Sequence, residues 1–239
     1  MDLEVNSLRV KLFADGADLS SMLDMASKPY IQGLTTNPTL MRKAGITNYV
    51  SFAKSVLNEI KHKPISFEVF SDDLEEMKIQ AEKIASWGEN VYVKIPVTNT
   101  LGITTKPVIK FLTQNGVKVN VTALMTVDQV NEVSEVLNPD TSSFVSVFAG
   151  RIADTGRDPV PIIKRSLVAL SGNSNAELIW ASPRELLNVV QADQIDCHII
   201  TATSDILAKL TLLGHDLDTY SLETVKMFRR DALASSFSF

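Results

Sequence analysis

The fold of this chain is decided by the segment VYVKIP at residues 91–96, which is apolar at nearly every position. A strand covered on one face alternates apolar and polar residues, whereas a parallel strand covered on both faces is a continuous apolar run. The β-branched and aromatic residues of Val91–Ile95 also suit a pleated, buried surface. We therefore predict a central parallel strand here, with one charged side chain, Lys94, inside it.

Seven more runs of this character occur along the chain, and the centres of all eight lie roughly 20–36 residues apart, the size of a strand–helix unit. The other predicted strands are Val10–Ala14, Tyr30–Leu34, Ile65–Phe70, Val117–Val121, Phe144–Phe148, Glu177–Ala181 and Cys197–Thr201. Between them, a helical period of apolar residues predicts the helices Tyr49–Lys61, Asp72–Trp87, Val108–Gln114, Val127–Leu137, Pro159–Ser171, Pro183–Gln191 and Ser204–Leu213. Predicted N-caps are Thr126, Asp158 and Ser182.

An eightfold alternation of strand and helix in 239 residues closes most naturally into an α/β fold of one domain, the (β/α)8 TIM barrel. A doubly wound open sheet is the competing architecture, but the first turn, Asp15–Asp18, lacks the glycine-rich phosphate loop of that fold. No linker divides residues 1–239. Beyond the barrel we predict a C-terminal helical tail at about residues 221–239, with a helix over Leu222–Ala234. Its apolar Phe237 and Phe239 could dock on the barrel or on a neighbouring subunit.

The charge balance and the cysteine content make several classes of protein poor candidates. With 23 basic and 28 acidic residues the net charge is −5, so the chain has no overall attraction for nucleic acid or anionic membranes. A single cysteine, Cys197, cannot form an intrachain disulfide, which predicts a reduced, cytoplasmic setting. We find no signal-peptide pattern and no apolar run near the ~18 residues that a membrane helix needs. The three histidines lack metal-binding spacing, so we predict no metal site.

Lys94 lies between Val93 and Ile95, where its side chain cannot easily reach solvent. An ammonium group buried without a partner is energetically expensive, so a lysine in such a place tends to be neutral. A neutral lysine is a nucleophile toward carbonyl groups. The other interpretation is an interior ion pair between Lys94 and Asp15 or Glu68, and the strand pattern alone favours neither.

Other polar residues fall at the ends of predicted strands, which is where the active sites of TIM barrels lie. Asp15 and Glu68 are candidate acid/base groups, because forming an imine and cleaving a C–C bond both require proton transfer. An aspartate next to Gly16 is also typical of a turn. Asn120 and Thr122 are two residues apart and therefore share one face of a strand.

Arg151, Ser182 and Arg184 form a candidate phosphate site after the sixth and seventh predicted strands. Guanidinium groups donate forked hydrogen bonds to phosphate oxygens, and a helix beginning after Ser182 would favour an anion at its N-terminus. The plainer interpretation is that both arginines are surface residues and Ser182 is only a cap.

Six motifs, in this order along the chain, resemble those of the transaldolase family, in its short type related to fructose-6-phosphate aldolases. They span nearly the whole chain, and each lies at a predicted strand end. The motifs are Leu34-Thr35-Thr36-Asn37-Pro38, Phe67-Glu68-Val69, Val93-Lys94-Ile95-Pro96, Asn120-Val121-Thr122, Val147-Phe148-Ala149-Gly150-Arg151-Ile152 and Ala181-Ser182-Pro183-Arg184.

The resemblance implies a class I mechanism without metal or organic cofactor, in which Lys94 forms an imine with the carbonyl of a ketose phosphate. By the same resemblance Asp15 is the acid/base for C–C cleavage, and Glu68 and Thr122 position a catalytic water. The residues implied to bind substrate are Asn37, Asn120 and Ser146 at its hydroxyl groups and Arg151, Ser182 and Arg184 at its phosphate. The usual substrates of the family are fructose 6-phosphate and erythrose 4-phosphate, in the pentose phosphate pathway.

Two positions bear on where the three-carbon dihydroxyacetone unit goes, because transaldolases pass it to another aldose and the related aldolases release it. Glu68 and Phe148 both match the transaldolase type, whereas the aldolase type has glutamine and tyrosine there. A tyrosine hydroxyl could help water to hydrolyse the intermediate, and a phenyl ring has no such group. Gly16, where relatives have threonine or serine, and Pro183 depart from the family pattern and leave the substrate preference open.

We therefore expect a transferase that moves a dihydroxyacetone unit from a donor such as fructose 6-phosphate or sedoheptulose 7-phosphate to an aldose phosphate. The alternatives are an aldolase that releases dihydroxyacetone, a relative that acts on a different sugar phosphate, and a barrel that kept the site as a binding or structural protein. Related short members form ring-based assemblies. The resemblance therefore also implies a homo-oligomer, such as a decamer, with the C-terminal helix as a contact.

Overall fold

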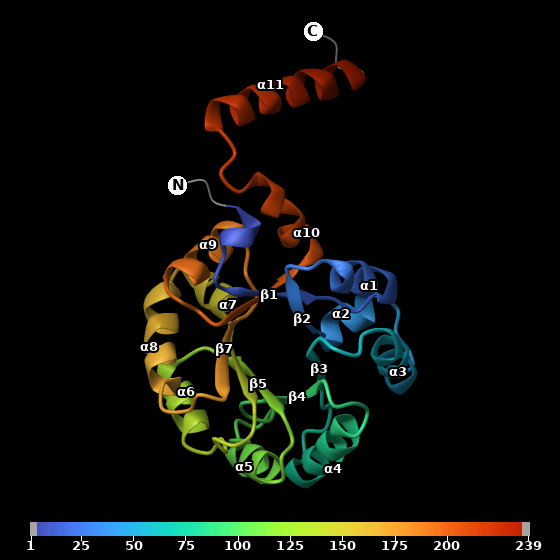
Figure 1. The fold of residues 1–239 in the computed structure, drawn as a ribbon, viewed down its shortest axis with the longest axis vertical. Helices are drawn as coiled ribbons and strands as arrows, with labels where there is room; N and C mark the ends of the chain where they lie inside the picture. The colour runs from blue at the N-terminus through green and yellow to red at the C-terminus, as the bar shows by residue number, and fades with distance from the viewer. Residues whose placement is uncertain (1–3, 236–239) are drawn as a thin grey trace.

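Eight parallel strands close into a barrel in the order β1-β2-β3-β4-β5-β6-β7-β8 in the computed structural model, which describes residues 4–235 (Figure 1). The strands are β1 Lys11–Asp15, β2 Ile31–Thr35, β3 Ile65–Glu68, β4 Val91–Pro96, β5 Val119–Leu124, β6 Ser143–Val147, β7 Ala176–Trp180 and β8 Ile199–Thr203. The barrel closes where β8 pairs in parallel with β1. The predicted TIM barrel is confirmed, and the doubly wound sheet is excluded.

Helices surround the barrel and carry the chain from each strand to the next (Figure 1). They are α1 Leu19–Ser27, α2 Pro38–Lys43, α3 Tyr49–Glu59, α4 Leu74–Ala85, α5 Lys106–Gln114, α6 Val127–Ser134, α7 Ala149–Ala153, α8 Val160–Leu170, α9 Leu187–Gln194, α10 Ser204–Leu207 and α11 Leu217–Ala234, with 3-10 turns at Val5–Ser7 and Ala208–Leu212. The sequence did not predict α1, α2 or α7. Within residues 4–235 no helix has both the length and the apolar character needed to cross a membrane.

The start of α9 differs from the prediction, which placed it at Pro183 with Ser182 as its N-cap. An N-cap residue normally has an extended backbone, whereas Ser182 has a φ of 59°, in the left-handed region. The helix begins only at Leu187. Before it, the side-chain oxygen of Asn188 accepts hydrogen bonds from the N–H groups of Arg184, at 2.7 Å, and Glu185, at 3.2 Å. The N-cap prediction for Ser182 is therefore wrong.

The other two predicted caps make the hydrogen bonds that were expected of them. The Thr126 hydroxyl accepts a hydrogen bond from the N–H of Gln129, and the Gln129 side chain bonds back in a capping box. The Asp158 carboxylate accepts a hydrogen bond from the N–H of Val160 at 2.9 Å, although α8 begins at Val160 and the N-cap position falls on Pro159, one residue after the prediction. These contacts satisfy N–H groups that the first turn of a helix leaves without partners.

The interior of the barrel is filled by an aromatic floor, which we define as Phe13, Tyr92 and Phe144 with the aliphatic residues around them. Tyr92 stacks on Phe144 with ring centroids 3.9 Å apart, and Phe13 meets Phe144 edge-on at 5.6 Å. Gly33 belongs to this packing, because a Cβ atom there would lie 2.4 Å from the Phe13 ring. The polar ends of the strands therefore stand above a packed apolar layer.

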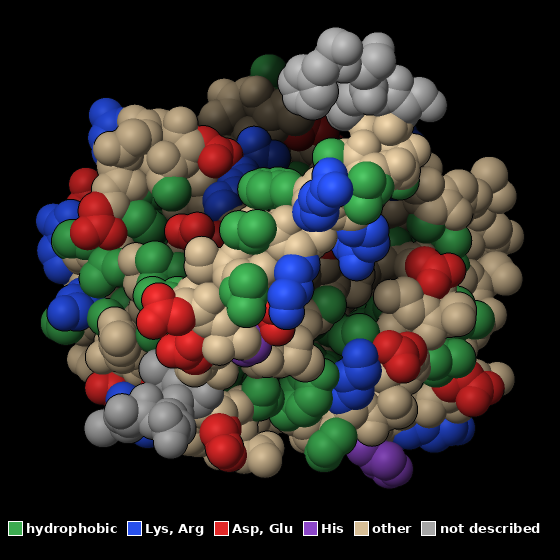
Figure 2. Space-filling view, turned by 90° about the horizontal axis from the view of Figure 1, so that it is seen from above, with side chains coloured by type: hydrophobic (Ala, Val, Ile, Leu, Met, Phe, Trp, Pro, Cys, Tyr) green, Lys and Arg blue, Asp and Glu red, His purple; other side chains and the backbone are tan. Residues whose placement is uncertain are grey.

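Helix α11 stands away from the barrel and none of its residues is buried (Figure 1). It confirms the predicted C-terminal helix but begins earlier, at Leu217, where Asp216 caps it. Large apolar side chains, including Val225 and Phe228, are more than half exposed on it. Figure 2 shows such side chains beside lysines and arginines along its outer surface. The last four residues, with the predicted docking residues Phe237 and Phe239, lie outside the described part of the chain.

Candidate active site

A cavity of about 560 Å³ opens at the end of the barrel where the strands end. Its size is within the range of small-molecule sites, and its position is that of TIM-barrel active sites. All of the candidate residues from the sequence line it: Asp15, Asn37, Glu68, Lys94, Asn120, Thr122, Ser146, Phe148, Arg151, Ser182 and Arg184. The fold thus brings together side chains that are far apart along the chain.

Lys94 lies on β4 and is only 7% exposed. The register of β3 and β4 places it directly beside Glu68, whose Oε2 is 3.1 Å from Lys94 Nζ. Nζ also donates a hydrogen bond to the carbonyl oxygen of Thr36 at 2.9 Å. The interior ion pair considered from the sequence is therefore present. It leaves the nucleophilic interpretation open, since Lys94 lines the cavity as well.

Asp15 ends β1 and is held by side chains from the neighbouring strand and the loop after it. Its Oδ1 accepts a hydrogen bond from Thr35 Oγ1 at 2.9 Å, and its Oδ2 accepts one from Asn37 Nδ2 at 3.2 Å. Burial raises the pKa of Asp15 above the ordinary range, although the positive charge of Lys94 and these hydrogen bonds oppose the shift. A carboxyl group with a raised pKa exchanges its proton closer to neutral pH, which suits an acid/base group.

Asn37 has a second function in the local structure. Its Oδ1 accepts a hydrogen bond from the N–H of Leu40 at 2.9 Å and so caps α2, where Pro38 occupies the first turn. The cap fixes the orientation of the amide group, and its Nδ2 then points at Asp15. The motif Thr36-Asn37-Pro38 therefore ends a strand, starts a helix and orients a carboxylate.

A buried chain of polar side chains crosses the barrel from β3 to β6. Asn120 donates a hydrogen bond from Nδ2 to Ser66 Oγ at 2.9 Å, and its Oδ1 accepts one from Ser146 Oγ at 2.7 Å. Thr122, two residues beyond Asn120, is also buried, but its hydroxyl has no hydrogen-bond partner among the described residues. A buried polar group without a partner is destabilising, and Thr122 is among the residues that line the cavity.

The backbone is strained at two positions in the cavity wall. Ala123 has a φ of 67° and Ser182 a φ of 59°, and each strained non-glycine residue costs of order 1–3 kcal/mol. The β5–β6 register is interrupted between Val121 and Leu124, so the bulge at Ala123 follows directly on Thr122. Such strain is concentrated at functional sites, where it aims particular side chains.

Gly150 brings the start of α7 against the loop that contains Ser182. A Cβ atom at residue 150 would lie 1.6 Å from the backbone oxygen of Ser182, so no other residue fits without moving the chain. The close approach places Arg151 beside Ser182 at the cavity rim, where both line it. Glycine at this point of the motif is therefore required by packing.

The two candidate phosphate-binding arginines lie at the rim of the cavity, and Arg184 already has an acidic partner. Arg184 Nε donates a hydrogen bond to Asp154 Oδ1 at 3.1 Å, and its Nη2 contacts the other oxygen of that carboxylate. Arg151 is exposed on α7. Both arginines are thus surface residues that also line the cavity.

Sequence reasoning missed several residues of the cavity wall, including Thr201, Thr203 and Asp205, and it assigned no role to Thr35, which it named only within a motif. Thr35 Oγ1 lies 2.6 Å from Thr201 Oγ1 and links Asp15 to β8, a strand from which no candidate came. Threonine is common in strands, so the three threonines gave no separate signal. Among residues 4–235 no group of three or more His, Cys, Asp or Glu side chains is arranged to hold a metal ion.

Comparisons with known proteins show which family the chain belongs to. Residues 12–238 match the family described as Transaldolase/Fructose-6-phosphate aldolase. A "Probable transaldolase" of Streptococcus equi subsp. zooepidemicus is 35% identical over 217 residues, which are 90% of this chain and 95% of that protein. A protein of the same description from Sulfurihydrogenibium sp. is 33% identical over 90% of this chain and 94% of its own.

A solved structure supports the fold alone. The crystal structure of KGPDC from Streptococcus mutans superposes with a TM-score of 0.56, covers 84% of this chain and 90% of that chain, and is 10% identical in sequence. The family match covers nearly the whole chain, and the relatives are about a third identical to it. These two findings confirm the family that the six motifs indicated. The chain belongs to the transaldolase/fructose-6-phosphate aldolase family of enzymes.

Proposed function

We propose that this enzyme is a class I transaldolase, which passes a dihydroxyacetone unit from a ketose phosphate, such as fructose 6-phosphate or sedoheptulose 7-phosphate, to an aldose phosphate. The observation that carries the proposal is the group formed by Lys94, Asp15 and Glu68 in one cavity, an amine with two carboxylates around it. Membership of the family supports it.

In the proposed reaction Lys94 Nζ, after losing a proton, adds to the ketone carbon of the donor to give a carbinolamine. Glu68, 3.1 Å from Nζ, is close enough to accept that proton. The carbinolamine takes that proton back from Glu68 onto its hydroxyl, loses water and becomes a protonated imine. Glu68 and the free hydroxyl of Thr122 are the groups that we assign to this water.

Asp15 then acts on the sugar itself. Its carboxylate takes the proton of the hydroxyl group beside the C–C bond that breaks, and that carbon leaves as the carbonyl of an aldose. The electron pair of the broken bond stays with the three-carbon unit as an enamine on Lys94. Addition of the enamine to the aldehyde of the acceptor, with return of the proton from Asp15, reverses these steps, and water finally releases the product from the lysine.

We assign the remaining wall of the cavity to substrate binding. Asn37, Asn120 and Ser146 would orient hydroxyl groups, since hydrogen bonds within the protein already fix their side chains. Arg151, Ser182 and Arg184 would bind the phosphate. Asp154 engages Nε and Nη2 of Arg184, so a phosphate would bind the remaining nitrogen of that guanidinium or replace the Asp154 carboxylate.

Two assays test the proposal. Borohydride added to the enzyme with fructose 6-phosphate should reduce the imine and attach one three-carbon unit to the chain. Coupled assays should then detect product with erythrose 4-phosphate present and little free dihydroxyacetone without it. Equal release of dihydroxyacetone with and without the acceptor would favour the aldolase alternative, and the absence of any adduct would remove the Schiff-base assignment.

Phe148 provides a test of transfer against release. The substitution Phe148→Tyr adds a hydroxyl group to a side chain that lines the cavity and packs on the aromatic floor. We expect release of free dihydroxyacetone to rise several-fold relative to transfer, because the phenol can bind the water that hydrolyses the intermediate. The measurement is the ratio of the two products. Phe111→Tyr, on exposed α5 surface, is the control, and an unchanged ratio in both variants would contradict the assignment of Phe148.

We also propose that the enzyme is a homo-oligomer assembled through α11. A helix with exposed Val225, Phe228 and Leu233 and no buried residue gains most by packing on another chain. Light scattering of the full chain should give several times the 26.3 kDa of one chain. A truncation after residue 216 should reduce that mass while the barrel stays folded. One chain mass for the full-length protein would refute the proposal.

A further inference from the structure

Tyr49, the first residue of α3, contacts the backbone of a candidate catalytic residue. Its hydroxyl accepts a hydrogen bond from the N–H of Glu68 at 2.8 Å and donates one to the C=O of the same residue at 3.0 Å. Both main-chain groups of Glu68 on this side are therefore satisfied by one side chain. Such a reciprocal contact fixes a residue much as a neighbouring strand does.

The topology of the barrel explains why Glu68 needs this contact. The pairing of β2 with β3 ends at Thr35 and Ser66, and β2 then turns away into α2. On the other side, β3 stays paired with β4, where the N–H of Val69 donates to the carbonyl oxygen of Lys94 at 3.1 Å. Successive residues of a strand face opposite neighbours, so the backbone groups of Glu68 point toward the missing part of β2.

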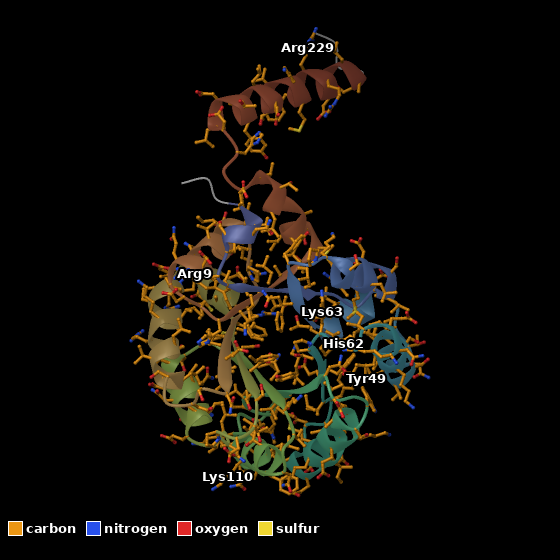
Figure 3. All side chains as sticks on the ribbon, in the orientation of Figure 1. Arg9, Tyr49, His62, Lys63, Lys110 and Arg229 are labelled. Atoms are coloured by element: carbon orange, nitrogen blue, oxygen red, sulfur yellow. The ribbon has the colours of Figure 1, made fainter. Side chains whose placement is uncertain are left out.

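Tyr49 is itself held firmly in place. Its ring meets Phe67 and Trp87 edge-on, with centroids 6.2 Å and 5.6 Å away, and lies 4.6 Å from the ring of Phe70. Figure 3 labels Tyr49 at the barrel side of α3. Burial raises the pKa of Tyr49, so its hydroxyl keeps its proton and can donate and accept at once.

We propose that Tyr49 is a positioning residue, which holds the end of β3 so that the Glu68 carboxylate stays within reach of Lys94 Nζ. The contact stands on the geometry alone, whereas its effect on catalysis rests on the proposed function. Glu68 is the last residue of β3 and lies two residues beyond Ser66, where the pairing with β2 ends, so without Tyr49 its backbone would be tied to the barrel only on the β4 side.

A double-mutant cycle of Tyr49→Phe and Glu68→Gln tests the effect on the reaction. Tyr49→Phe keeps the packed ring and removes the hydroxyl, and we expect kcat for transfer to fall about tenfold or more, with KM little changed. In the Glu68→Gln background the same change should alter kcat less than about twofold, because residues that act as a unit are not additive. An equal loss in both backgrounds would reduce Tyr49 to a general structural residue and overturn the proposal.

The matched control is Tyr92→Phe, in the aromatic floor. It also removes a tyrosine hydroxyl that forms a hydrogen bond, since the Tyr92 hydroxyl lies 2.7 Å from Ser142 Oγ. It should show no coupling to Glu68→Gln. Thermal unfolding of each variant separates loss of folded protein from loss of activity.

Hydrogen exchange resolved to single residues tests the contact without any substrate. In Tyr49→Phe the amide of Glu68 should exchange at least about tenfold faster, while that of Val69, bonded to Lys94, should keep its rate. If the wild-type enzyme forms no adduct and transfers nothing, the proposed function fails. The exchange rate of the Glu68 amide still shows whether Tyr49 holds the end of β3. Unchanged protection of Glu68 in the variant would overturn the proposal in either case.

Discussion

Replacing Lys94 with arginine is expected to abolish the borohydride-trapped adduct and to lower transfer activity by more than about 10³-fold. The guanidinium group keeps a positive charge beside Glu68, which Lys94 Nζ approaches to 3.1 Å, but it cannot form an imine with a ketone. Without the imine, no enamine can hold the three-carbon unit, and both transfer and release stop. Mass spectrometry of the borohydride-treated chain is the measurement.

Arginine is a better test than alanine at this position. Lys94→Ala would leave the partly buried Glu68 carboxylate without its partner, and breaking such a pair is strongly destabilising. The control is Lys106→Arg, at a lysine that also forms an ion pair, 3.4 Å from Glu132, on the outer helices. That variant should be trapped like the wild type. An adduct that persists in Lys94→Arg would show that another amine carries the reaction.

Replacing Asp15 with asparagine is expected to lower kcat by about 10²- to 10⁴-fold, the usual contribution of a positioned acid/base group, while the imine still forms. The adduct trapped from fructose 6-phosphate should then retain the whole six-carbon donor, because the C–C bond is not cleaved. An adduct of three carbons in Asp15→Asn would assign the cleavage step to a different group.

Asp15→Asn is expected to lower activity but to raise the stability of the fold, by an amount that depends on pH. Burial raises the pKa of Asp15, so the folded protein binds this proton more tightly than the unfolded chain does. The stabilising contribution is complete below the ordinary aspartate pKa and is lost as the pH rises through the raised value. Above the raised pKa the wild type therefore carries an ionised, buried carboxylate that Asp15→Asn removes. We expect the variant to gain stability relative to the wild type as the pH rises above the ordinary aspartate pKa, measured by denaturant unfolding at a series of pH values.

The activity of the wild type should also depend on whether Asp15 is protonated. Asp15 must be ionised to take a proton from the sugar, so kcat should fall as the pH drops through its raised pKa. Asp18→Asn is the control. Asp18 caps α1 by accepting a hydrogen bond from the N–H of Ser21, and asparagine is an equally good N-cap residue. A stability difference between Asp15→Asn and wild type that does not change with pH would contradict this account.

The strands and the central group of the site were predictable because they follow strong physical signals. Eight apolar runs gave the barrel, and Lys94 was found because a charge inside such a run is rare. The boundaries were harder, since β5 extends to Leu124 through a bulge at Ala123 that no residue type announces. The short helices α2 and α7 contain too few residues to show a helical period.

Contacts made by the backbone or between distant residues could not be read from the chain. The hydroxyl of Tyr49 bonds the main chain of Glu68, so neither residue type reveals the other. Arg184 and Asp154 are thirty residues apart and meet only because Gly150 lets two loops touch. Ser182 followed by proline is typical of a helix start, yet its backbone is left-handed in the folded protein.

The aromatic floor affects which substitutions an enzyme of this architecture can accept during evolution. Tyr92 stacked on Phe144 fills the barrel below the cavity, and the polar residues that line the cavity belong to no part of that apolar cluster. Exposed polar residues at the rim of the cavity, such as Arg151, can therefore be exchanged without refilling the interior, so changes at the rim cost little stability. A substitution in the floor acts in the opposite way, because it alters how much folded enzyme a cell holds before it alters what that enzyme recognises.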